Sequence, residues 1–86
     1  MTNETFVAKT GAPAEEIDGT AVLMNREDGG LYGLNPVAAQ VWEWLQEPRT
    51  LAQLVDLLTG EFDVDADTAE VDLKLLLAEL HGRGLI

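Results

Sequence analysis

The spacing of apolar residues changes near Asn35 of this 86-residue chain. Before Asn35, short apolar runs are separated by segments rich in Gly and acidic residues, a pattern typical of strands joined by turns. After Asn35, apolar residues recur every three or four positions, which indicates amphipathic helices. This order of elements predicts an α+β fold in which strands come first and helices follow.

Three strands are expected in the first part of the chain: Glu4–Thr10, Thr20–Asn25 and Leu31–Leu34. The segment Gly11–Gly19 is expected to be a loop because it contains Gly, Pro and several acids. Arg26–Gly30 is expected to connect the second and third strands as a hairpin, since Asp-Gly-Gly accommodates positive φ without steric cost. The third strand would then pair antiparallel to the second.

Three helices are expected in the second part. Asn35 and Pro36 suit the cap and first position of a helix that runs to about Gln46 and ends before Pro48. Thr50 is expected to cap a second helix that ends near Gly60. Asp65 is expected to cap a third that reaches about His81. A three-stranded antiparallel sheet followed by three helices predicts a winged helix-turn-helix-like fold.

The third helix carries more apolar surface than one core contact requires. With about 100° of turn per residue, one face holds Ala69, Leu73, Leu76, Leu77 and Leu80. Val71, Leu75 and Ala78 cluster on the opposite side, which should be polar on a helix at the surface of a small domain. Two interpretations remain open: the helix is sandwiched between other elements, or its second apolar flank borders a groove.

The strand Leu31–Leu34 has features of an edge that another chain can use. It contains neither charge nor proline, which normally protect exposed strand edges. Tyr32 and Gly33 suit a place where another chain approaches closely, although Tyr32 as a core residue and Gly33 as a bulge are equally good interpretations. An unpaired edge beside an apolar helix flank predicts a site for an extended peptide, bound as an added strand.

The composition narrows the classes of function. Sixteen acids and five Lys and Arg give a formal net charge of −11, which repels phosphate backbones and favours a basic partner, unless it serves solubility alone. The chain has no Cys, so disulfides and thiolate metal sites are excluded. No apolar run approaches the roughly 20 residues of a membrane helix, and the N-terminus lacks the pattern of a signal peptide. A single cytoplasmic domain spanning residues 1–86, without membrane contact, is expected.

The sequence offers few candidates for catalytic or metal-binding residues. The chain has no Ser and no Cys, and its one histidine, His81, is expected at a helix end, where it suits the helix dipole. A calcium loop that starts at Asp63 needs Gly at its sixth position and Glu at its twelfth, and those positions hold Thr68 and Lys74. We therefore expect no enzyme, no metal and no cofactor.

A winged helix also suggests a DNA-binding regulator. A recognition helix needs Arg, Lys, Asn or Gln to contact base edges and cations to contact phosphates. The polar positions of the third helix are mostly acidic: Glu70, Asp72, Lys74, Glu79 and His81. The sequence therefore predicts a non-catalytic peptide adaptor, with no nucleic-acid partner, and keeps the DNA-binding regulator as an alternative.

Three stretches of the chain resemble the PqqD-like family of peptide-recognition elements. They are LYGLNPVAAQVWEWL, RTLAQLVDLLTGEFDVD and VDLKLLLAELHGRGLI. The features that match the family pattern, in chain order, are Leu34-Asn35, Val41-Trp42, Arg49-Thr50, Asp65, Asp72 and Gly84-Leu85. The resemblance covers residues 20–86 and leaves residues 1–19 as an N-terminal strand and loop.

The resemblance implies a winged-helix-like domain that binds the leader of a ribosomally made precursor peptide as an added strand. It implies backbone pairing by Leu31, Tyr32, Gly33 and Leu34, a pocket lined by Val71, Leu75 and Ala78, and selection of polar leader groups by Lys74 and Glu79. It gives Asp72 a role in either fold or binding.

The chain is most similar to the stand-alone recognition proteins of split lasso-peptide pathways. Leaders there often carry a Tyr-x-x-Pro element. The implied partners are the leader, a cysteine protease that removes it, and an ATP-dependent cyclase that acts afterwards. The alternative within the family is a chaperone of a radical-SAM enzyme in quinone-cofactor synthesis.

Overall fold

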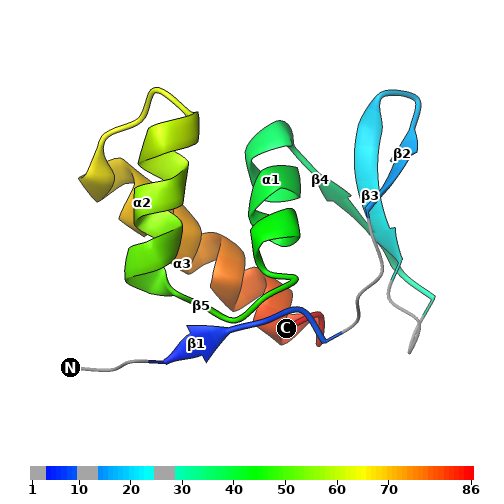
Figure 1. Cartoon of the computed structure of the whole chain (residues 1–86). Coiled ribbons are helices and arrows are strands. Elements are labelled where there is room, and N and C mark those ends of the chain that lie inside the picture. Colours follow the sequence, from blue (N-terminus) through cyan, green and yellow to red (C-terminus); the bar gives the residue numbers. More distant parts are fainter. Residues whose placement is uncertain (1–3, 10–13, 25–28) are drawn as a thin grey trace.

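The computed structural model describes residues 4–9, 14–24 and 29–86 and confirms the α+β class. Its elements are β1 (Thr5–Phe6), β2 (Glu15–Ile17), β3 (Thr20–Met24), β4 (Leu31–Leu34), α1 (Pro36–Trp44), β5 (Arg49–Thr50), α2 (Leu51–Glu61) and α3 (Ala66–Gly82). An antiparallel sheet with strand order β2-β3-β4 precedes the helices, which gather beside it (Figure 1).

Two expectations about the strands are wrong. Glu15–Ile17, expected to be a loop, forms β2, because Asp18 and Gly19 adopt φ of 51° and 81° and turn the chain back onto β3. The N-terminal strand is short and does not join this sheet. It pairs with β5, which brings Thr5 opposite Thr50 and Phe6 opposite Arg49. The predicted three-stranded sheet therefore exists, but β2 takes the place assigned to the N-terminal strand.

β3 and β4 pair in a regular antiparallel register from Ala21↔Leu34 to Met24↔Leu31. The last residue of the expected second strand, Asn25, and residues 26–28 of the expected Arg26–Gly30 connection lie outside the described residues. Gly29 has the positive φ of 73° that the connection predicted. Gly33 pairs with Val22 in this regular ladder, so the bulge interpretation of Gly33 is wrong.

All three predicted caps are present. Asn35 Oδ1 accepts a hydrogen bond from Ala38 N at 2.8 Å, and Asp65 Oδ1 accepts one from Thr68 N at 2.7 Å. Thr50 and Gln53 form a reciprocal capping box. The helix ends differ slightly from the prediction: α1 ends at Trp44, before the expected Gln46, while α2 and α3 each continue one residue further, to Glu61 and Gly82.

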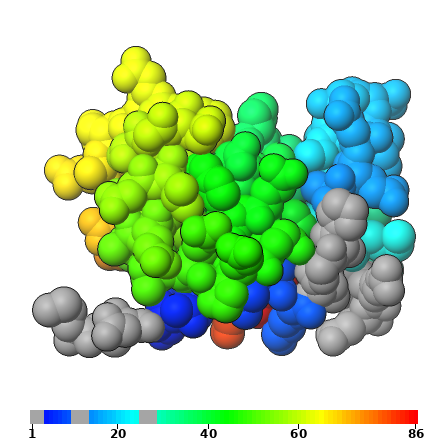
Figure 2. Space-filling view, viewed as in Figure 1, coloured from blue at the N-terminus to red at the C-terminus, as the bar shows by residue number. Residues whose placement is uncertain are grey.

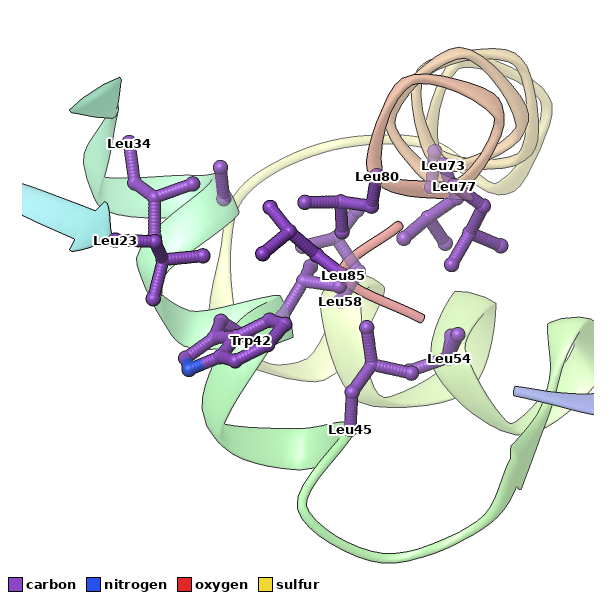
Figure 3. Close-up of a cluster of buried hydrophobic side chains, with 13 residues drawn as sticks. Leu23, Leu34, Trp42, Leu45, Leu54, Leu58, Leu73, Leu77, Leu80 and Leu85 are labelled. Carbon is purple, nitrogen blue, oxygen red and sulfur yellow. The ribbon is translucent and has the colours of Figure 1, made fainter. Parts of the chain in front are cut away.

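One apolar core joins the sheet to the helices. Its buried members come from β3, β4, all three helices and the C-terminal segment: Leu23, Leu34, Ala38, Val41, Trp42, Leu45, Leu54, Leu58, Ala69, Leu73, Leu77, Leu80 and Leu85. Figure 3 shows Leu23 and Leu34 of the sheet on one side of Trp42 and the leucines of α3 on the other. None of the buried residues in the described part of the chain is polar.

The N-terminal segment closes the core from below the helices as drawn in Figure 1. Ala8 N donates to the Leu45 carbonyl at 2.7 Å, and Lys9 N donates to the Leu85 carbonyl at 3.0 Å. These bonds tie the segment after β1 to the end of α1 and to the C-terminal residues. In the part of the chain that the structure describes, no helix is long and apolar enough to cross a membrane.

We expect Leu73→Ala and Leu75→Ala to differ sharply in their effect on stability, although both change α3. Leu73 is 1% exposed, so the cavity left by its removal should lower the free energy of unfolding by about 2–5 kcal/mol. Leu75 is 68% exposed, so its removal should change that free energy by less than about 0.5 kcal/mol. Urea denaturation of both variants checks this, and equal losses would contradict the burial pattern of α3.

Candidate peptide-binding groove

The strand β4 lies at one edge of the sheet. Its backbone pairs with β3 on one side, and no described strand pairs with it on the other. A Cβ added at Gly33 would meet no heavy atom within 4 Å outside its immediate chain neighbours, so the chain itself leaves this position open. The backbone of Leu31–Leu34 therefore offers hydrogen-bonding groups to an incoming strand.

A cleft of about 400 Å³ lies between this strand, the start of α1 and the middle of α3. Its lining residues are Tyr32, Gly33, Asn35, Val37, Ala38, Asp72, Leu75, Leu76 and Glu79. Aliphatic side chains from α1 and α3 line it, and along α3 the acids Asp72 and Glu79 lie one before and one after Leu75 and Leu76. From the side drawn in Figure 2, α1 and α2 cover most of α3.

The apolar flank of α3 is open to solvent. Val71 is 58% exposed, Leu75 is 68% exposed, and Ala78 is also exposed. The interpretation that α3 is sandwiched between other elements is therefore wrong. On the opposite face of the helix, Ala69, Leu73, Leu77 and Leu80 are buried, as predicted. Large exposed aliphatic side chains beside an unpaired strand edge are typical of a surface that binds a partner.

Tyr32 connects the strand edge to the last turns of α3. Its ring lies under the Arg83 guanidinium, with 4.6 Å between the guanidinium carbon and the ring centroid. Its hydroxyl donates to the Glu79 carboxylate, and Glu79 also pairs with Arg83 at 3.9 Å. Partial burial, followed by the hydrogen bond and the negative charge of Glu79, raises the pKa of Tyr32, while the charge of Arg83 opposes this rise. This network holds the strand against the helix.

The predicted site residues fall into two groups. Tyr32, Gly33, Leu75 and Glu79 meet at the cleft. The other five lie outside its lining: Leu31, Leu34, Val71, Lys74 and Ala78. Leu34 is buried in the core and Leu31 is 64% exposed, so these two contribute backbone rather than side chains to the edge. Lys74 pairs with Glu70 at 3.3 Å, one turn earlier on α3.

The remaining lining residues were not predicted from the sequence to take part in binding. Asn35, Val37 and Ala38 were assigned to the cap and inner face of the first helix, and they reach the cleft because α1 starts directly after β4. Leu76 was assigned to the core face and is half-buried at its border. For Asp72, the sequence left open whether the side chain serves the fold or peptide binding. The heptad spacing of Asp72 and Glu79 is the sequence signal that could have placed both on one side of α3.

A second cleft of about 380 Å³ lies on another side of α1, against β2 and β3. Glu16, Ala21, Ala39, Gln40 and Glu43 are among the residues that line it. The adjacent edge strand β2 carries the consecutive acids Glu15 and Glu16, which protect an edge from pairing. The groove beside β4 is therefore the better site for an added strand.

Among residues 4–9, 14–24 and 29–86, no three His, Cys, Asp or Glu side chains come together as a metal site. His81 is exposed near the end of α3, outside the lining of the β4 cleft. The chemistry that this groove offers is backbone pairing, apolar contact and charge.

Comparisons with known proteins found a family model and a similar solved structure. Residues 20–86 match the family model described as coenzyme PQQ synthesis protein D (PqqD). Among solved structures, the chain is similar to TbiB1 in complex with the TbiA(beta) leader peptide, with a TM-score of 0.78, 29% sequence identity and 93% of each chain covered. No curated protein matches the chain. The family resemblance predicted from the sequence is confirmed.

We expect Glu79→Gln to lower the pKa of Tyr32. The substitution removes the carboxylate that accepts the hydroxyl hydrogen bond and disfavours the tyrosinate, and it leaves Arg83 in place. Tyr32 is the one tyrosine of the chain, so its tyrosinate absorbance during a pH titration reports this group alone. Glu70→Gln, on the same helix, is the control and should leave the midpoint unchanged.

The raised pKa also has a consequence for stability. The contribution of neutral Tyr32 is fully present below the pKa of the unfolded state, about 10, and is lost as the pH rises through the higher folded-state value. The Glu79→Gln variant should therefore lose less stability over this alkaline range than the parent protein, as measured by urea denaturation at several pH values. An equal loss in both would contradict the Tyr32–Glu79 interaction.

Proposed function

We propose that this chain, which belongs to the PqqD family, binds the leader segment of a ribosomally made precursor peptide as an added β-strand on β4. The observation that carries the proposal is the edge of β4, unpaired among the described strands, which shares a cleft with the exposed Leu75 of α3. The similarity to TbiB1, which is bound to a leader peptide in its solved structure, supports it.

The groove has the physical means to hold an extended peptide. Each backbone hydrogen bond to the open edge contributes about 0.5–1.5 kcal/mol net. Covering the Leu75 side chain, now 68% exposed, contributes up to about 1.5–3 kcal/mol. A few such contacts, after the cost of ordering the peptide, suit a dissociation constant on the order of micromolar. Recognition by backbone and apolar contact needs no catalytic group, so we infer a non-catalytic adaptor.

The adaptor would deliver the leader to enzymes that act on the precursor. By its family resemblance, the partners are a leader-removing cysteine protease and then an ATP-dependent cyclase of a lasso-peptide pathway, in the cytoplasm where the precursor is translated. The PqqD-type alternative is delivery to a radical-SAM enzyme in quinone-cofactor synthesis. The other alternative, a winged-helix DNA-binding regulator, lacks support on α3, where Asp67, Glu70, Asp72 and Glu79 outnumber the cations.

We expect Leu75→Glu to weaken leader binding at least tenfold without unfolding the domain. The substitution places a charge where the peptide would cover an apolar side chain, and burying an unpaired charge is costly. The measurement is a calorimetric or fluorescence titration with a synthetic leader from the neighbouring precursor gene. Ile17→Glu is the matched control, because Ile17 is also an exposed aliphatic residue, at 49%, but lies on β2.

The same titration, followed by amide NMR signals, locates the bound strand. The proposal requires the largest changes in Leu31–Leu34, with smaller ones on the β2 edge. Saturable binding that perturbs β2 instead would place the leader elsewhere. If no precursor leader encoded beside this gene binds, the proposed function is wrong.

We also expect the adaptor to accelerate leader removal by its protease. Linking precursor and protease through the adaptor raises their effective concentration, so cleavage of a dilute precursor should speed up by at least tenfold. Adaptor carrying Leu75→Glu should give little acceleration, and the Ile17→Glu protein should act like the parent. Mass spectrometry of the cleaved leader measures the rate. If the Leu75→Glu variant accelerated cleavage as much as the parent protein, the adaptor would activate the protease without binding the leader through Leu75.

A further inference from the structure

We infer that Asp72 makes the groove selective for leaders with a Lys or Arg two positions from the apolar residue that contacts Leu75 and Leu76. The inference rests on the proposed function, because it assigns a chemical preference to the same groove. It concerns a residue whose role the sequence left open between fold and binding.

Asp72 differs from Glu70 and Glu79 in having no hydrogen-bond or ion-pair partner among the described residues. The Glu79 carboxylate accepts from Tyr32 and pairs with Arg83, and Glu70 pairs with Lys74. The carboxylate of Asp72 makes no hydrogen bond or ion pair within the described part of the chain. It lines the cleft and is exposed. A carboxylate in this position is free to pair with a cation of the bound peptide.

The cations on and directly after α3 do not pair with the Asp72 carboxylate. Lys74 is two positions from Asp72, a spacing that does not place side chains face to face on a helix. Its ammonium is 3.3 Å from Glu70. Arg83 is eleven residues from Asp72, roughly 16 Å along the helix axis, and contacts Tyr32 and Glu79. The cation that would match Asp72 must come from the ligand.

The spacing of the groove matches an extended peptide. Asp72 precedes Leu75 and Leu76 by three and four residues, which is about 4.5–6 Å along the helix axis. Side chains on one face of a strand recur every second residue, about 6.6–6.8 Å apart. One peptide side chain can therefore contact the two leucines while the next on the same face reaches Asp72.

The two ends of the cleft also set the order of these residues. Glu79 marks the end beside Tyr32, and Asp72 lies about 10.5 Å away along α3. Asn35 and Val37, which follow β4 in the chain, also line the cleft, so the inference places Asp72 at the α1 end, opposite Tyr32 and Glu79. A leader that runs antiparallel to β4 would place its cation before its apolar residue, as in Lys-x-Leu. A parallel leader would have the reverse order.

The net charge of −11 attracts any cationic peptide, so the test must separate Asp72 from this general field. Asp56 is the matched control. It is exposed on α2, outside the cleft, and Asp56→Asn changes the net charge by the same amount as Asp72→Asn. A general field predicts equal effects of the two substitutions, and a local ion pair predicts an effect of Asp72→Asn alone.

The experiment uses a synthetic leader from the neighbouring precursor gene in which every Lys and Arg is replaced by Gln. One Lys is returned at a time, at each successive position. We expect one position at which Lys strengthens binding about three- to fivefold at low salt, the range of an accessible ion pair. This gain should persist in Asp56→Asn, disappear in Asp72→Asn, and become a loss in Asp72→Lys.

The apolar partner of that position is then located by replacing leader residues with Ala. The leader residue whose replacement by Ala costs much less with Leu75→Ala than with the parent protein contacts Leu75, and it should lie two positions from the Lys. Equal Lys dependence in Asp72→Asn and Asp56→Asn, or a different spacing, would overturn the inference while leaving leader binding intact. Failure of every leader to bind the parent protein would refute the proposed function instead.

Discussion

Burial of Leu34 fixes the position of the open sheet edge. Its side chain is 3% exposed and lies in the core with Leu23 of the neighbouring strand. A slip of one residue in the β3–β4 register would turn Leu34 to the outer face and empty its place in the core, so the register is strongly determined. The same core contains Leu73 and Leu77 of α3. One cluster thus holds both walls of the groove.

The groove is consequently formed before a peptide arrives. The Asn35 cap starts α1 directly after β4, and the contacts of Tyr32 with Glu79 and Arg83 connect the strand to α3. Because the site is preformed, ordering it costs little free energy when the peptide binds. Most of the ordering cost therefore comes from the leader. A leader recognised through backbone pairing can vary in sequence, and the few groove side chains then decide which leaders are preferred.

Local signals in the sequence predicted most of the fold. Asn35, Thr50 and Asp65 each open a helix with a side-chain oxygen that accepts from the backbone, and this chemistry is complete within four residues. The pairing of β1 with β5 could not be predicted in the same way, because it depends on a contact between residues far apart in the chain. Strand β2 has the composition of a loop, with two acids and one exposed Ile, and forms because the Asp18-Gly19 turn places it on β3.

The site was predictable to the extent that it follows the period of one helix. That period placed Leu75 and Glu79 on the exposed side of α3, and the cleft contains both. It could not say which part of that side faces β4, since this depends on the angle at which α3 crosses the sheet. Asp72 and Leu76 lie on the side that faces the strand, while Val71, Lys74 and Ala78 lie outside the cleft lining.

The two margins of the sheet also differ in how they tolerate other copies of the protein. Strand β2 places Glu15 and Glu16 side by side at its margin, so two molecules that approach through it meet like charges. Replacing both glutamates with uncharged side chains would remove this repulsion and leave the exposed Ile17 on a strand that has no second partner among the described residues. The two carboxylates therefore keep whole molecules from pairing sheet to sheet through this margin.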